Sequence, residues 1–227
     1  SLFNLLTKSR QHIGNWPGVT VEKKEGTLKF KGESYKVIDL PGTYSLGAYS
    51  EDEIVARNYI LKDKPDVVIN VVDATNLERN LYLTTQLIEM GANVVIALNM
   101  IDQAEALNIE IDTNKLSKRL GVPIIKTSAL KNRGIEELIE TSIHSKKNEK
   151  LININYGEDI ENEIKNLSSL LETYKNKLEF PVNWTALKLL ENDEYIKDKV
   201  KQLNSPSIFT KLEESNKTIE KNIGFEA

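Results

Sequence analysis

Three short polar motifs carry the residue types that could do chemistry in this chain. The first is Asp39-Leu40-Pro41-Gly42, which follows the strand-like run 35–38. An Asp at the end of a strand can hold Mg²⁺ through water. A Gly three residues later lets a backbone N–H approach a phosphate oxygen, because no Cβ stands in the way. Alone, Asp-x-x-Gly more often marks a simple turn after a strand, so its meaning depends on the other two motifs.

The second and third motifs also follow apolar, strand-like runs. Asn99-Met100-Ile101-Asp102 comes after the run 94–98, and Ser128-Ala129-Leu130 comes after the run 122–126. In an open α/β sheet, ligands bind at the carboxyl ends of the strands. All three motifs fall at such ends, which predicts a single ligand site.

The elements that must position these motifs alternate between strands and helices. A capping box at Ser50 and Glu53 begins one helix, and Gly121 ends another. We expect helices over 2–6, 51–61, 77–90, 115–120 and 135–144, an antiparallel hairpin of 27–31 with 34–40, and buried strands over 67–72, 94–98 and 122–126. This alternation predicts an α/β fold with a mostly parallel sheet flanked by helices.

The loop 13–22 precedes the hairpin and is rich in Gly and Pro. Thr20 can be read as the first residue of a strand, or as a loop hydroxyl or carbonyl that completes a Mg²⁺ shell. Trp16 lies between Asn and Pro, and we expect it to be exposed as a contact surface rather than buried in the core.

The charged stretch 145–150 predicts a solvated linker and a domain boundary. We therefore divide the chain into a first domain, residues 1–145, and a second, residues 146–227. Beyond the linker, apolar residues recur at helical spacing: Ile160, Ile164, Leu167, Leu171 and Tyr174. The second domain is expected to be small and all-helical, with no catalytic signature of its own.

Composition excludes several classes of protein. The chain has 227 residues and a formal net charge of −4, which argues against nucleic acid as the main partner. It has no Cys, and its two His have no metal-site spacing, so Fe²⁺ is not expected to bind here. No apolar run is long enough for a membrane span, and no signal peptide is visible. These features predict a soluble intracellular protein. Both ends look cut, so we expect a fragment.

Taken together and in this order, the three motifs resemble the guanine-nucleotide-binding domain of small regulatory GTPases. In that family the Asp of Asn-x-x-Asp accepts two hydrogen bonds, from the guanine N1–H and the exocyclic amine. The Ser-Ala segment supplies a backbone N–H to guanine O6. Adenine lacks this donor pair, so the resemblance implies selection of guanine by Asp102.

The match narrows to one family. The segments 14–22, 39–45, 71–81 and 99–102 resemble the cytoplasmic N-terminal region of the prokaryotic ferrous iron transport protein B family, and 184–191 is similar to its helical domain. The resemblance implies a P-loop GTPase-type fold and a switch that binds and hydrolyses GTP. That switch would regulate ferrous iron uptake through a C-terminal membrane transporter portion, on the cytoplasmic side of the cell membrane. Homo-oligomers are left open.

The chain departs from the family pattern at several places. The phosphate-binding loop Gly-x-x-x-x-Gly-Lys-Ser/Thr and the strand before it are absent, and Ser1-Leu2-Phe3-Asn4 looks like the segment that comes directly after that loop. We expect the sequence to begin just past this loop; the alternative is a pseudo-GTPase. Met100 replaces the Lys common in small GTPases but agrees with the transporter family, and Lys8 stands where many members have Gly.

The resemblance assigns roles residue by residue. It implies a GTP or GDP site formed by Ser1, Gly18, Val19, Thr20, Val21, Glu22, Asp39, Leu40, Pro41, Gly42, Asn99, Met100, Ile101, Asp102, Ser128, Ala129 and Leu130. Mg²⁺ would be held by Thr20 and by Asp39 through water. The candidate catalytic groups are Thr20, Gly42 and Thr43. Because Thr43 replaces a water-orienting Gln, we expect slow hydrolysis with the water positioned by the Thr20 loop backbone, and K⁺ adding positive charge.

Two other functions stay open. A stand-alone assembly GTPase acting on ribosomes is disfavoured by the acidic balance and by the lack of a basic tail. A non-catalytic interaction module with a vestigial nucleotide fold depends on whether the phosphate loop exists.

Overall fold

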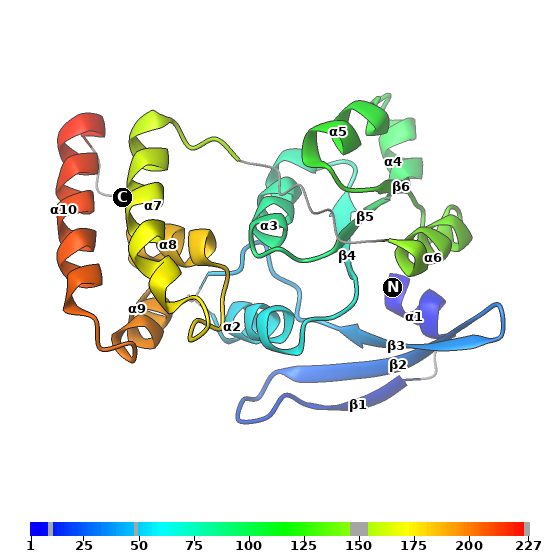
Figure 1. The fold of residues 1–227 in the computed structure, drawn as a ribbon. Helices are drawn as coiled ribbons and strands as arrows, with labels where there is room; N and C mark the ends of the chain where they lie inside the picture. The colour runs from blue at the N-terminus through cyan, green and yellow to red at the C-terminus, as the bar shows by residue number, and fades with distance from the viewer. Residues whose placement is uncertain (9–10, 48–49, 146–153, 225–227) are drawn as a thin grey trace. The chain divides into compact units, whose positions relative to one another are not determined.

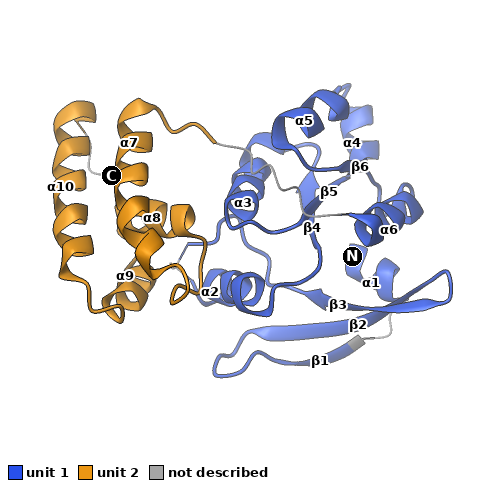
Figure 2. Ribbon diagram, viewed as in Figure 1, with its two compact units in different colours: residues 1–152 blue, residues 153–227 orange. Residues whose placement is uncertain are grey.

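The computed structural model describes residues 1–8, 11–47, 50–145 and 154–224. It divides into two compact units, residues 1–152 and 153–227 (Figure 2). The domain boundary expected after residue 145 and most of the expected linker fall on 146–153, outside the described residues. That boundary therefore stays a prediction.

The first unit alternates strands and helices along the chain (Figure 1). Its elements are α1 (Leu2–Thr7), β1 (Gln11–Asn15), β2 (Glu22–Phe30), β3 (Glu33–Asp39), α2 (Glu51–Asn58), a π-helical turn (Tyr59–Asp63), β4 (Val68–Asp73), α3 (Leu77–Glu89), β5 (Val94–Asn99), α4 (Ile101–Ala106), α5 (Thr113–Leu120), β6 (Ile124–Lys126) and α6 (Ile135–His144). The helices and strands expected from the sequence are present, with ends shifted by a few residues.

The parallel sheet has the strand order β4-β5-β6. In register, Val68 pairs with Val94 and Ile96 with Ile124. The central strand β5 is an unbroken apolar run, and its residues 94–98 are all buried, as a strand covered on both faces requires. Side chains from α1 and α6 form one core with β5 and β6: Leu2, Leu6, Val95, Ala97, Ile125, Ile135, Leu138 and Ile139. The predicted α/β fold with a parallel sheet flanked by helices is confirmed.

A second, antiparallel sheet has the order β1-β2-β3. The expected hairpin forms, with Phe30 opposite Glu33 and Lys24 opposite Asp39. The loop expected over 13–22 is partly wrong, since residues 13–15 belong to β1 and Glu22 begins β2. There Asn15 pairs with Glu22, and the Trp16 N–H donates to the Val21 carbonyl at 2.9 Å. Backbone hydrogen bonds across the hairpin outweigh the local preference of Gly and Pro for a loop.

The expectation that Trp16 is exposed is wrong. Its side chain is buried, with the ring edge-to-face on Tyr59 at 5.3 Å between centroids. The Lys23 ammonium lies 4.7 Å from the centroid of the Trp16 ring. Tyr59 belongs to the π-helical turn, far away in sequence, so the residues that flank Trp16 gave no sign of this packing.

Helix ends follow the residue types expected of them. The Ser50 side chain accepts from the Glu53 N–H at 3.2 Å and caps α2. Gly121 ends α5 in the left-handed conformation, with φ of 60°. Lys8 does the same at the end of α1, with φ of 50°. A Gly adopts this conformation with less strain, which explains why Lys8 is unusual there.

The second unit is all-helical, as predicted. Its elements are α7 (Glu158–Leu171), a 3₁₀ turn (Glu172–Tyr174), α8 (Val182–Leu190), α9 (Glu194–Lys201) and α10 (Pro206–Ile223). The core is apolar, and its fully buried members include Leu167, Leu171, Leu189, Ile196 and Ile208. One polar contact is buried with it: the Ser215 hydroxyl donates to the Glu163 carboxylate at 2.6 Å. Across both units, no described helix is long and apolar enough to span a membrane.

Candidate functional site

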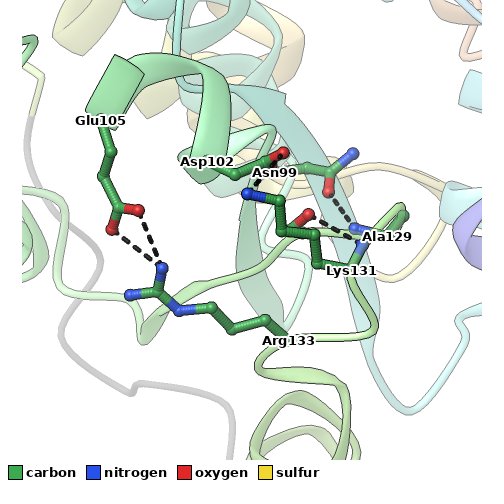
Figure 3. Close-up of polar contacts among 7 residues, drawn as sticks. Asn99, Asp102, Glu105, Ala129, Lys131 and Arg133 are labelled. Carbon is green, nitrogen blue, oxygen red and sulfur yellow. Dashed lines mark hydrogen bonds and ion pairs between the residues drawn. The ribbon is translucent and has the colours of Figure 1, made fainter.

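The residues expected to contact a base come together at the carboxyl ends of β5 and β6 (Figure 3). Asn99 is the last residue of β5, and its side-chain oxygen accepts from the Ala129 N–H at 3.0 Å. The Thr127 hydroxyl lies 3.5 Å from the same oxygen. Asn99 therefore ties the end of one strand to the loop that follows the next.

Asp102 lies in the first turn of α4, directly after that strand. Met100 precedes the helix in the left-handed conformation, with φ of 60°, and Ile101 is buried. The Asp102 side chain is only 10% exposed. The Ser128 side chain lowers the pKa of Asp102 most, with smaller contributions from Lys131 and Arg133. The carboxylate is therefore ionised at neutral pH and can accept hydrogen bonds.

The loop after β6 is closed on itself. Ser128 and Arg133 exchange two backbone hydrogen bonds, both 3.0 Å long. The Lys131 N–H donates to the Ser128 hydroxyl at 3.1 Å, and Leu130 is 85% exposed at the loop surface. Gly134 then leads into α6 with φ of 74°, and a Cβ there would lie 2.1 Å from the Lys126 carbonyl oxygen. Only Gly fits this close approach.

The segment that begins at Asp39 carries the second group of expected site residues. The Asp39 carboxyl ends β3, is half-buried, and makes no hydrogen bond or ion pair with any residue that the structure describes. Burial raises the pKa of Asp39 most, Glu22 raises it further, and Lys24 partly opposes the rise. Leu40 and Pro41 are half-buried, and Gly42 is exposed with open space where a Cβ would stand. Its N–H is thus accessible to a ligand.

Beyond Gly42 the segment is anchored by contacts that were not predicted from the sequence. The Thr43 hydroxyl accepts from the Ser45 N–H at 3.0 Å and donates to the Ser45 carbonyl, so it is used within its own turn. The Gln86 side chain on α3 accepts from the Leu46 N–H at 2.7 Å. Gln86 is a polar residue on the buried face of α3. A polar residue among apolar ones at such a position could have indicated from the sequence that its side chain forms a specific hydrogen bond.

The loop between β1 and β2 contains the remaining expected residues. Gly18 has φ of 79°, Thr20 is exposed, and Val19 and Val21 are half-exposed. In the register of β2 and β3, Asp39 pairs with Lys24. Thr20 precedes Glu22, the first residue of β2, and therefore lies outside the paired part of the two strands. Ser1 caps α1, where its hydroxyl accepts from the Asn4 N–H, and the strand register does not place Thr20 opposite Asp39.

The metal-ligating groups in this part of the molecule suit a hydrated Mg²⁺ and not an ion coordinated entirely by protein side chains. Among the described residues, no group of three or more His, Cys, Asp or Glu side chains is arranged to hold a metal ion. Within the described ranges Asp39 is a half-buried carboxylate at a strand end with no hydrogen-bond or ion-pair partner, and such an oxygen fits a cation that keeps most of its waters.

Comparison with known proteins identifies two family regions. A family model described as ferrous iron transport protein B matches residues 1–142, and one described as the FeoB cytosolic helical domain matches residues 156–227. The chain is 52% identical over 201 residues to the Fe(2+) transporter FeoB of Methanocaldococcus jannaschii, covering 88% of this chain and 30% of that protein. The chain therefore spans less than a third of this curated relative's length.

Solved structures match both units. A point mutant of S. thermophilus NFeoB bound to mGDP has a TM-score of 0.90 and 40% identity, covering 99% of this chain and 85% of that one. The cytosolic domain of the T. maritima FeoB iron transporter in its GMPPNP form has a TM-score of 0.84 and 38% identity, covering 97% and 92%. With the motifs, the fold and both family regions in agreement, the chain belongs to the ferrous iron transport protein B family.

Proposed function

We propose that this chain binds guanine nucleotides and acts as a GTP-hydrolysing switch in ferrous iron uptake. The observation that supports it most is the grouping of Asn99, Asp102 and the Ser128–Ala129 backbone at one edge of the parallel sheet. Its relatives carry the name Fe(2+) transporter, and solved structures similar to it hold mGDP or GMPPNP.

Asp102 provides the base selection in this proposal. Its ionised carboxylate accepts hydrogen bonds only, so it matches the N1–H and 2-amino donors of guanine and finds no such pair on adenine. The site is shielded, since the Asp102 side chain is 10% exposed, and a mismatched base would leave the carboxylate unpaired. Met100 directly precedes α4, and Leu130 is exposed in the loop after β6.

The nucleotide phosphates would bind to two segments of the chain, Asp39 to Thr43 and Gly18 to Glu22. Asp39 would hold Mg²⁺ through water and Thr20 would complete its shell; the ion, when bound, neutralises phosphate charge. The Gly42 N–H would contact the terminal phosphate. Because the Thr43 hydroxyl is engaged with Ser45, we expect slow hydrolysis in which backbone groups of the Thr20 loop position the water and K⁺ adds positive charge. Loss of the terminal phosphate would release both segments.

The role in the whole protein is inferred from the family. We propose that this chain lies on the cytoplasmic side of the membrane, regulates a transporter portion of the same protein, and leaves Fe²⁺ transport to that portion. Homo-oligomerisation belongs to the same proposal.

The test is nucleotide competition on the full-length natural protein. A fluorescent GDP analogue should bind and be displaced by GDP and GTP but not by ATP. The variant Asp102→Ala should weaken GDP binding by at least about 100-fold, because two hydrogen bonds to a charged group are lost. The exposed Asp66→Ala serves as the matched control and should bind like the wild type. Absence of binding to the wild type would favour the interaction-module alternative.

A further inference from the structure

The Asp102 carboxylate is surrounded by donors that belong to the protein itself. The Ser128 hydroxyl accepts from the Lys131 N–H at 3.1 Å, which leaves its own proton available to Asp102. The Lys131 ammonium lies 3.9 Å from the Oδ2 atom of Asp102 (Figure 3). The group expected to receive guanine donors is therefore already supplied with protein donors.

Of the two cations near Asp102, Lys131 is the available one. Arg133 also lowers the pKa of Asp102, but its Nη1 atom lies 2.9 Å from both carboxylate oxygens of Glu105. That contact holds the guanidinium at Glu105. Lys131 has no other ion-pair partner among the residues that the structure describes.

The backbone holds Lys131 within reach of Asp102. Lys131 lies inside the loop closed by the paired hydrogen bonds between Ser128 and Arg133, and its own N–H is bound to Ser128. Its side chain is 65% exposed, so the ammonium can swing into water at little cost when another donor takes its place. The Lys131 backbone is therefore held in place, while its ammonium can move away from Asp102.

We propose that Lys131 sets the affinity of the site for guanine by competing with the base for the Asp102 carboxylate. This inference rests on the proposed function. Guanine offers two N–H donors, one to each carboxylate oxygen, and the donor that reaches Oδ2 takes the place of the Lys131 ammonium, which lies 3.9 Å from that atom. Binding of the base therefore displaces Lys131, and the ion pair belongs to the empty site alone.

A competitor of this kind has a kinetic signature. Removing it raises the association rate and leaves the dissociation rate unchanged, since the bound state never contained the ion pair. An exposed ion pair contributes little, so the expected gain in affinity is about twofold to fivefold. The gain should be equal for GDP, GTP and IDP, because it arises before any contact with the base. It should shrink at high salt, where the ion pair is screened.

The experiment is stopped-flow binding of a fluorescent GDP analogue to the full-length natural protein. The variants are Lys131→Met and Lys131→Gln, which remove the charge, and Lys131→Arg, which keeps it. The control is Lys118→Met on α5, which makes the same change in net charge at an exposed lysine for which no ion pair is seen among the described residues. We expect faster association for the two uncharged variants and wild-type rates for Lys131→Arg and Lys118→Met.

The outcomes separate this inference from the proposed function. If the wild type and Lys118→Met bind no guanine nucleotide, the proposed function fails and the inference falls with it. If they bind but Lys131→Met associates no faster, or dissociates faster, Lys131 is not a competitor and the inference alone is overturned. A gain confined to one nucleotide would likewise contradict it, because that result would show a contact in the bound state.

Discussion

At the scale of single residues, the two carboxylates of the candidate site differ in how the protein treats them. Asp102 is supplied with donors, and its pKa is lowered mainly by the Ser128 side chain. Asp39 has no hydrogen-bond or ion-pair partner among the described residues, and burial raises its pKa. The first can accept hydrogen bonds from a base, whereas the charge of the second is only partly offset by Lys24 and would be stabilised further by a cation.

The difference predicts a pH-dependent gain in stability for Asp39→Asn. A raised pKa means that the folded state binds the proton more tightly than the unfolded state, so stability falls as the pH rises from the ordinary pKa of Asp to the raised pKa of Asp39, and the whole loss is present above it. Without nucleotide and Mg²⁺, the variant should melt about 1–2 °C higher at pH 7, a small rise because solvent screens a half-buried group. The gain should vanish below about pH 3.5, where both proteins are uncharged at this position. Thermal unfolding across this range is the measurement, and a lower melting temperature at pH 7 would contradict it.

At the scale of elements, Gly134 joins the loop after β6 to α6, and its backbone packs closely against Lys126. Gly134→Ala would combine a positive φ of 74° with a Cβ 2.1 Å from a backbone oxygen. We expect a loss of at least about 2 kcal/mol in the free energy of unfolding, measured by chemical denaturation. The control is Gly32→Ala, whose φ is 88° but whose Cβ would meet nothing within 4 Å. The free energy of unfolding of Gly32→Ala should fall by only about 1 kcal/mol, the strain of a positive φ at a residue with a Cβ. Equal losses would show that the close approach is unimportant.

Elements with strong local patterns were predictable from the sequence, and contacts across the fold were not. The unbroken apolar run of β5 and the Gly residues that end helices identify their elements without help from the rest of the chain. Trp16 was misplaced because Tyr59, its packing partner, lies in another element. The motifs after β5 and β6 lie at one edge of the parallel sheet, whereas the Asp39 motif ends β3 of the antiparallel sheet, so the prediction of one site for all three motifs stays a prediction. The Lys131 contact with Asp102 could not be foreseen, since it depends on the closure of the loop by Ser128 and Arg133.

At the scale of the whole molecule, the helical unit has its own stabilising contacts, which can be tested separately. Glu163 on α7 is buried and accepts from the Ser215 hydroxyl on α10 at 2.6 Å. Ser215→Ala should reduce the protection of α7 and α10 amides against hydrogen exchange about tenfold or more, because a buried carboxylate loses a donor. Protection of β5 should not change. Ser169→Ala is the control, since Ser169 is exposed and bonds only within α7. Equal effects of the two variants would contradict the prediction.

Helix α3 contacts the segment that follows Asp39 through two side chains that lie two turns apart. Gln86 accepts from the Leu46 N–H in the interior, and the Arg79 guanidinium lies 3.8 Å from the centroid of the exposed Tyr44 ring. A helix is stiff over the roughly 10 Å between these points. The buried hydrogen bond between Gln86 and Leu46 is harder to break than the exposed contact between Arg79 and Tyr44. A displacement of Gly42 would therefore break the contact of Tyr44 first and rotate Tyr44 away from α3, while Leu46 stays bound to Gln86.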